Sequence, residues 1–250
     1  MRRMATVMAA AAAAACLLAG CKDQVEPSAL ERFVERTSAL DGQVLEDTLR
    51  SFLDDGPPNA TYASFLLGNR FYDLASDSAA AGGWDTPGTK ALLDSAEVHF
   101  MRAIGQDSTF VEALVNMGSV WDDRAQMRGS REDRDHALNS AIAMYMQAVA
   151  VDSTGEKARC NLGGVYMRQR RLPEAIEQFQ AVLDHDPKSA LAHYNLAIMF
   201  AEQKIYREAL KEWELAAKYD PDGDIGSRSR ENVKIVMDLM NAPAPQGAAH

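Results

Sequence analysis

The sequence lacks the short motifs that mark most catalytic, phosphate-binding and metal-binding sites. It contains no Gly-rich phosphate loop, His-Glu-x-x-His pair, Cys-x-x-Cys pair or Gly-x-Ser-x-Gly elbow. Its histidines are scattered along the chain, and the acidic pairs Asp122-Asp123 and Glu132-Asp133 lack the ligand spacing of a calcium loop. These absences predict a chain that is not an enzyme and that needs no cofactor and no metal.

Positive charge and cysteine are both scarce. The 250 residues include 26 Lys and Arg against 36 Asp and Glu, for a formal net charge of −10. A chain this acidic has little attraction to phosphate backbones, so nucleic acid is not an expected partner. The three cysteines are Cys16, Cys21 and Cys160, and the first two belong to an N-terminal leader. No pair then remains for an internal disulfide, and we expect Cys160 to be a small packed thiol.

The first twenty residues have the pattern of a secretory signal peptide. A basic start, Arg2-Arg3, precedes an alanine-rich apolar run, and the run ends in Leu18-Ala19-Gly20-Cys21. This ending resembles the lipobox of bacterial lipoproteins, which implies cleavage after residue 20 and lipidation of Cys21. The alternative is an ordinary secretory signal with an incidental cysteine. The apolar run is too short to favour a membrane-spanning helix.

The lipobox resemblance also implies a location. The mature chain would be held to a membrane by its acyl chains and would face the periplasm. Lys22 follows the cysteine, and in the enterobacterial sorting pattern a residue other than Asp implies the outer membrane more than the inner one. Cleavage removes two arginines and no acidic residue, so the formal charge becomes −12, from 24 basic and 36 acidic residues.

A 34-residue repeat occupies the second half of the chain. A fixed period of this length indicates helical hairpins that stack and bury their apolar faces against one another. The residues that recur are Leu162 and Leu196, Gly163 and Ala197, Tyr166 and Phe200, Ala175 and Ala209, Phe179 and Trp213, and Pro187 and Pro221.

Two further copies precede this pair, each with an insertion between its two helices. The aromatic residue of the first helix and the alanine of the second are 9 residues apart in Tyr166–Ala175, 20 apart in Trp121–Ala141 and 25 apart in Phe71–Ala96. The insertions therefore have 11 and 16 residues and fall at the same turn. We expect the 11-residue insertion, in the second repeat, to lengthen both helices of its hairpin. We expect the 16-residue insertion, in the first repeat, to contain a mobile loop at 81–88 before a helix from Thr89.

The pattern Leu-Gly-x-x-Tyr, Ala-x-x-x-Phe and Pro resembles that of the tetratricopeptide repeat family. The resemblance implies an all-α fold, a right-handed superhelical solenoid of about four helical hairpins with flanking helices at both ends. The family's first tryptophan is missing, and two of the four closing prolines are serine. The replacements are Ser64, Leu114, Arg159 and His193 for tryptophan, and Ser108 and Ser153 for proline.

The resulting domain prediction divides the chain into six parts. Capping boxes at Ser28/Glu31 and Ser130/Asp133 mark two helix starts, and a C-terminal capping helix is expected to start at Ser227. The parts are a signal peptide at 1–20, a lipidated tether at 21–27, an N-terminal helical hairpin at 28–58, the repeat array at 61–223, a C-terminal capping helix at 224–241 and a disordered tail at 242–250. The four repeats are placed at about 61–110, 111–155, 156–189 and 190–223.

In this family the first helix of each hairpin, helix A, lines an inner groove with its second, fifth, ninth, twelfth and thirteenth positions. The resemblance therefore nominates a partner-binding groove with aromatic and aliphatic anchors, and Trp84 as the most adhesive residue of a crest formed by the insertions. Two alternatives remain: the N-terminal hairpin fills the groove, or the nominated residues pack between repeats. The nominated groove residues are Tyr62, Phe65, Asn69, Tyr72, Val115, Ser119, Tyr194 and Ile198.

Three functional classes are compatible with these features. The favoured one is a lipid-anchored protein-protein interaction scaffold or assembly factor of the bacterial cell envelope, with another envelope protein or peptide segment as its partner. That choice rests on analogy between folds. The second is a periplasmic peptide- or ligand-binding module without catalytic activity. An enzyme is the least favoured.

Overall fold

The computed structural model describes residues 27–241, and the fold of this part is all-α. It contains eleven α-helices and one short 3-10 helix, with no β-strand among the described residues. In the same range no helix is long and apolar enough to cross a membrane. The predicted signal peptide, Cys21 and the C-terminal tail lie outside the described residues.

The chain divides into two compact units, Met1–Leu67 and Gly68–His250. The described part of the first unit holds α2 (Ala29–Thr37), α3 (Gly42–Ser51), η1 (Phe52–Asp54) and the beginning of α4 (Asn59–Gly82). The capping box of Ser28 and Glu31 is confirmed at the start of α2. Its apolar core joins the hairpin to α4 through Phe33, Leu49, Ala63 and Leu67.

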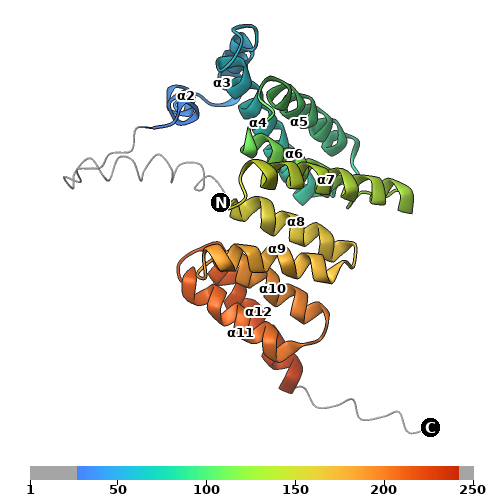
Figure 1. Ribbon diagram of the computed structural model, residues 1–250. Helices are drawn as coiled ribbons and strands as arrows, with labels where there is room; N and C mark the ends of the chain where they lie inside the picture. The colour runs from blue at the N-terminus through green and yellow to red at the C-terminus, as the bar shows by residue number, and fades with distance from the viewer. Residues whose placement is uncertain (1–26, 242–250) are drawn as a thin grey trace, which may run out of the picture. The chain divides into compact units, whose positions relative to one another are not determined.

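The second unit is a stack of helical hairpins, which Figure 1 shows in chain order from α5 to α12. Each hairpin pairs a helix A with a helix B, and each helix A also packs against the next one along the chain from α6 onward. The A helices are α4, α6 (Val111–Arg124), α8 (Glu156–Arg168) and α10 (Ala190–Glu202). The B helices are α5 (Pro87–Gln106), α7 (Arg131–Val151), α9 (Leu172–His185) and α11 (Tyr206–Tyr219), and α12 (Asp224–Asn241) follows.

Glycine allows the two helices of a hairpin to cross closely. A Cβ added to Gly163 would lie 2.7 Å from Cζ of Phe179, and one added to Gly118 would lie 2.5 Å from Cε1 of Tyr145. Both aromatic rings are buried in the core. The repeat therefore needs its smallest residue on helix A where helix B contributes its largest one.

The 34-residue period continues into α12. The helices α8, α10 and α12 begin at residues 156, 190 and 224, each 34 after the last. The eighth residue is Gly163 in α8 and Ala197 in α10, but it is Glu231 in α12. A glutamate cannot occupy a close helix crossing, so α12 is a helix A whose sequence excludes a following helix B. It occupies 224–241, the range predicted for the C-terminal capping helix, although it begins three residues before the start signal at Ser227.

The insertion of the first repeat forms helix rather than a mobile loop. The helix α4 continues to Gly82, and α5 begins at Pro87 with Thr86 as its cap, so only 83–86 connect them. The run Ala79-Ala80-Ala81 has high helix propensity, and Gly83 ends the helix with φ +87°. The prediction of a loop at 81–88 was therefore wrong, because it gave the Gly and Pro residues more weight than the alanines before them.

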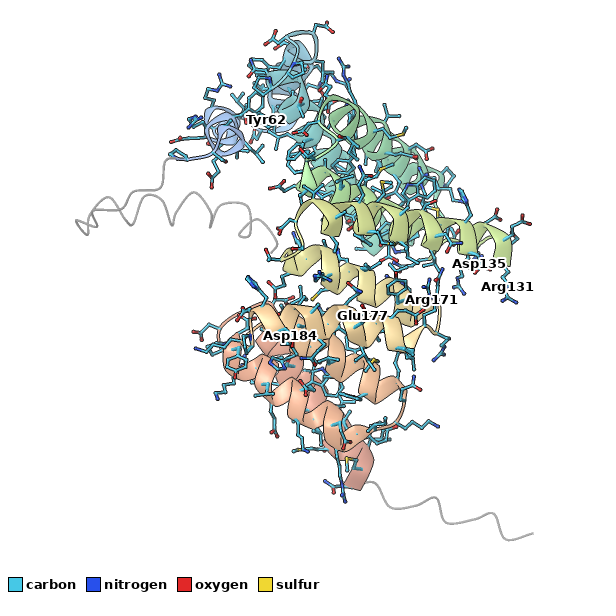
Figure 2. All side chains as sticks on the ribbon, in the orientation of Figure 1. Tyr62, Arg131, Asp135, Arg171, Glu177 and Asp184 are labelled. Carbon is cyan, nitrogen blue, oxygen red and sulfur yellow. The ribbon has the colours of Figure 1, made fainter. Side chains whose placement is uncertain are left out.

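The insertion of the second repeat lengthens one helix instead of two. The helix α6 has 14 residues, while α7 has 21 and begins with the predicted capping box of Ser130 and Asp133. Turn hydrogen bonds from the backbone N–H of Gln126 and Met127 end α6 directly after Arg124. The first turns of α7 therefore extend beyond α6, and Figure 2 shows Arg131 and Asp135 on this extension.

Candidate binding surface on the A helices

Two of the nominated groove residues belong to the first unit and pack within it. The rings of Tyr62 and Phe33 lie 5.8 Å apart between centroids. Phe65 is buried, with 7% of its surface exposed. Beside Tyr62 lies an open recess of about 360 Å³ that also includes Arg32, Phe33 and Arg36 of α2. Tyr62 therefore packs on the N-terminal hairpin within the first unit and is not a free aromatic anchor.

The next nominated residues form hydrogen bonds between successive A helices. The Nδ2 of Asn116 on α6 donates to Oδ1 of Asn69 on α4 at 2.7 Å. One turn further along, the hydroxyl of Tyr72 donates to Oδ2 of Asp123 at 2.6 Å. Both pairs join the first repeat to the second, so Asn69 and Tyr72 hold the array together in addition to lining its inner face.

A polar cluster surrounds the end of α6. Asp122 pairs with Arg168 of α8, and its second oxygen, Oδ1, is buried with no hydrogen-bond partner among the described residues. Asp123 accepts from Tyr72 and, through its other oxygen, from Nε2 of Gln126 at 2.9 Å. Two adjacent carboxylates thus face a single guanidinium, which leaves one negative charge unbalanced in a half-buried place.

This arrangement changes the acid-base properties of the cluster. Burial raises the pKa of Asp123 to about 6, and the charge of Asp122 adds to this rise while Tyr72 and Arg168 oppose it. Burial also raises the pKa of Asp122, against the attraction of Arg168. The pKa of Tyr72 is raised by burial and by the charge of Asp123, so this phenol stays a hydrogen-bond donor throughout the physiological range.

Ser119 lies on the same side of α6, next to this cluster. Its hydroxyl is 3.1 Å from the hydroxyl of Tyr145 and 3.2 Å from the carbonyl oxygen of Val115. Burial is the main cause that raises the pKa of Tyr145. Ser119 is therefore engaged within its own repeat and is only half-buried.

The aliphatic and aromatic anchors of the second unit are mostly core residues. Val115 is 4% exposed and Tyr194 is 7% exposed. The guanidinium of Arg228 lies 5.1 Å from the ring centroid of Tyr194 and covers it from α12. Ile198 is half-buried and packs against two core clusters. The prediction that these side chains offer exposed anchors is corrected: inter-repeat packing, the second alternative, describes Val115 and Tyr194.

Cys160 is also a core residue. It is 1% exposed, and burial raises the pKa of its thiol to about 12. The charge of Glu156 raises this pKa further, while a hydrogen bond with Asn195 opposes the rise. The expectation of a small packed thiol is confirmed.

The two insertions meet at one edge of the array. Asp85, next to Trp84, accepts a hydrogen bond from the backbone N–H of Arg128 at 2.7 Å and lies 3.7 Å from its Nε. Arg124 of α6 pairs with Glu97 of α5 and stacks on Trp121. Trp84 is half-buried in the connection between α4 and α5. The two connections therefore contact each other, and Trp84, nominated as the most adhesive residue of a crest, presents only part of its indole to solvent.

The accessible part of the inner face is mainly charged. The exposed groove positions are Asp73, Glu112, Lys157, Arg168 and Glu202, and Gly164 adds an open backbone patch where an added Cβ would meet no atom within 4 Å. The pKa of Asp73 is raised by partial burial and by the charge of Asp77. Sequence reasoning placed these residues on the inner face but chose the aromatic ones as anchors, because position alone does not reveal which side chains are covered.

The described residues include no group of three or more His, Cys, Asp or Glu side chains placed to hold a metal ion. His193 makes contacts that hold the fourth repeat together. Its Nδ1 lies 2.6 Å from Glu212 and its Nε2 lies 3.2 Å from the carbonyl oxygen of Pro187. It connects helix A, helix B and the preceding turn of the fourth repeat.

Comparison with known proteins agrees with this architecture. Residues 160–224 match a tetratricopeptide repeat family model. This segment covers most of the two compact hairpins, from within α8 onward, and the match does not include the two hairpins with insertions. No curated protein sequence matches the chain.

Solved structures show the same fold over most of the chain. A tetratricopeptide repeat protein of Thermus thermophilus, TTC0263, is 13% identical, with a TM-score of 0.63 over 83% of this chain and 96% of its own. A tetratricopeptide repeat protein from Parabacteroides merdae is 15% identical, with a TM-score of 0.59 over 83% of this chain and 73% of its own. MamA is 18% identical, with a TM-score of 0.53 over 79% of this chain and 97% of its own. The fold is therefore a solenoid of tetratricopeptide-type hairpins.

Proposed function

We propose that this protein is a lipid-anchored interaction scaffold of the bacterial cell envelope. The observation that carries this proposal is the set of exposed charged side chains and the open backbone at Gly164 on the A helices of the stacked hairpins. Solenoids of this type act through such extended surfaces and not through catalytic pockets. The lipobox-like sequence before Cys21 supports anchoring to a membrane, with the array facing the periplasm and the outer membrane favoured by Lys22.

The partner that suits this surface is a segment of another envelope protein. Because the aromatic side chains are largely covered, recognition depends on the charged rim of the inner face more than on apolar anchors. Asp73, Glu112, Asp122 and Asp123 outnumber the cations of the first half of that face, so a segment with basic residues is complementary there. The second half of the inner face begins with Lys157 and Arg168 and is more basic and more apolar than the first half.

A charge-reversal experiment tests this proposal. The lipidated protein is crosslinked in membranes, and the proteins that co-purify with it are compared between wild type and Glu112→Lys. Glu177→Lys is the matched control, because Glu177 is also an exposed acid and lies on the B helix α9 (Figure 2). We expect one specific partner to be lost from Glu112→Lys and kept by Glu177→Lys. A partner lost equally from both variants, or kept by both, contradicts a role of the inner face.

Anchoring has a test of its own. Cys21→Ser, placed behind a secretory signal that is cleaved without lipidation, removes the lipidation site while leaving every described residue unchanged. We expect wild type in the membrane fraction, resistant to high salt, and Cys21→Ser in the soluble periplasmic fraction. Equal membrane association of the two proteins would contradict the lipid anchor.

A second candidate is a periplasmic module that binds a peptide or small ligand without catalysis. The open recess beside Tyr62, with two arginines on one turn of α2, favours it. Substituting Arg32 and Arg36 together by Gln separates the candidates: ligand binding in this recess would be lost, while partner capture on the A helices would be unchanged.

A further inference from the structure

The end of α12 exposes an apolar surface that the repeat fold does not use. The helix has 18 residues, five more than α8 and α10 in the same register. Those five extra residues include Met237, Leu239 and Met240, which are 43%, 55% and 46% exposed. Ile235, one turn before Leu239, is 57% exposed. Exposed large apolar side chains are thus concentrated in one and a half turns of helix.

A further helix B of the same array does not fit this surface. The face of α12 that a helix B would cover carries Ser227, Glu231, Lys234 and Asp238, at a spacing of three to four residues. Ile235 and Leu239 lie to the side of that polar row, on the edge that continues the inner positions of the A helices. The apolar residues therefore do not serve to extend the solenoid.

Residues 242–250 lack the large apolar side chains that would cover this surface. The segment 242–250 contains Ala, Pro, Gln, Gly and His, without Leu, Ile, Val, Met or an aromatic residue. Covering four or five large apolar side chains requires side chains of similar size from elsewhere. A membrane surface is a poor occupant because the polar row beside these residues carries Glu231 and Asp238 against Lys234, whereas helices that lie on membranes are rich in Lys and Arg on their polar face.

We propose that the end of α12 packs against the end of α12 of a second copy, in an antiparallel two-fold contact. Such a contact places Ile235 of one copy opposite Leu239 of the other. It also brings Lys234 within reach of Asp238 of the partner copy, twice by symmetry, because these residues flank the apolar row on one side. The apolar row and its charges are therefore self-complementary, which is what an isologous interface requires.

The size of this contact predicts a weak dimer. One and a half turns of helix bury less than the area of a standard interface, about 800 Å² per partner. Association is then detectable only at high protein concentration in solution. On a membrane a lipid anchor would raise the local concentration, but the contact itself does not depend on the anchor or on the inner face of the A helices.

Sedimentation equilibrium of the processed chain with Cys21→Ser tests this proposal, over a concentration range from about 10 μM to about 1 mM. We expect a monomer–dimer equilibrium for this protein. With Ile235→Glu and Leu239→Glu added, we expect dimerisation to weaken at least about tenfold, whereas Val98→Glu and Met101→Glu on α5 should leave it unchanged. These control residues are 64% and 58% exposed.

A charge swap makes the test specific for the antiparallel contact. Lys234→Glu should weaken the dimer, and adding Asp238→Lys to it should restore most of the affinity. A monomer at every concentration, a dimer that tolerates Ile235→Glu and Leu239→Glu, or a swap without recovery overturns the proposal. Binding to lipid vesicles that depends on Ile235 and Leu239 without dimerisation would assign the surface to a membrane instead. Loss of partner capture by Glu112→Lys is measured separately and does not bear on these results.

Discussion

The close crossing of α8 and α9 can be tested with two neighbouring glycines. A Cβ on Gly163 would lie 2.7 Å from Cζ of Phe179, whose ring is fully buried and cannot move aside without disturbing the core. A Cβ on Gly164 would have no atom within 4 Å. Both residues lie in the middle of α8, so replacement by alanine gives the same gain in helix propensity, about 1 kcal/mol. The difference between the two variants therefore isolates the contact with Phe179.

Overpacking a close-packed core costs about 1–3 kcal/mol. We therefore expect Gly164→Ala to be more stable than wild type by up to about 1 kcal/mol, and Gly163→Ala to be less stable than Gly164→Ala by about 1–3 kcal/mol. In a chain of this size that difference corresponds to a shift in Tm of roughly 2–4 °C per kcal/mol.

The assay is urea unfolding followed by far-UV circular dichroism, with the slope of the transition checked for each variant. Phe179→Leu provides a double-mutant cycle, because a smaller side chain should relieve part of the cost of Gly163→Ala. If Gly163→Ala proved as stable as Gly164→Ala, the close approach of the two helices would be refuted.

Three further predictions concern titratable groups. Burial lowers the pKa of His193, but the hydrogen bonds from Glu212 and the Pro187 carbonyl, together with the charge of Glu212, outweigh burial and raise this pKa overall. Wild type should therefore be more stable than His193→Gln below pH 6.5, and it should lose this advantage as the pH rises through the folded-state pKa of His193. Equal pH profiles of unfolding free energy would contradict this. Burial raises the pKa of Asp123 to about 6, so wild type should lose stability from pH 4 to pH 6 relative to Asp123→Asn. Parallel profiles would show that Asp123 titrates normally. Cys160 should react with a thiol reagent at pH 8 only after urea unfolding, and fast labelling of the native protein would contradict its burial.

The fold was predictable from the sequence because its determinants are local and periodic. Gly163, Ala175 and Phe179 have counterparts at the same offset in the fourth repeat, and their spacing alone implies two helices that cross closely. The structure confirms the all-α solenoid and both capping boxes, at Ser28 and at Ser130. Helix lengths inside the insertions were less predictable, because alanine propensity and glycine or proline breakers compete over a few residues. The turns at Arg170 and Lys204, with positive φ at non-glycine residues, carry no sequence signal at all.

The character of the candidate surface could not be predicted from the sequence. The inner positions of the A helices come from the family register, and in the structure Asn69, Tyr72 and Ser119 form hydrogen bonds to neighbouring helices or residues. The exposure of a side chain depends on which other residues cover it, and the repeat register does not specify those residues. Arg228 covers Tyr194 from a helix outside the four repeats, so no argument from one repeat could have shown that this ring is closed off.

The most direct test of an interaction scaffold is site-specific photo-crosslinking in cells. A photoreactive residue replaces Asp73 or Gly164 on the inner face, and Met146, an exposed residue on the B helix α7, is the control position. We expect both inner positions to form a covalent adduct with the same envelope protein, and the position of Met146 to form none with that protein. Adducts from Met146 alone, or no adduct from either inner position, would contradict a partner-binding role for the A helices.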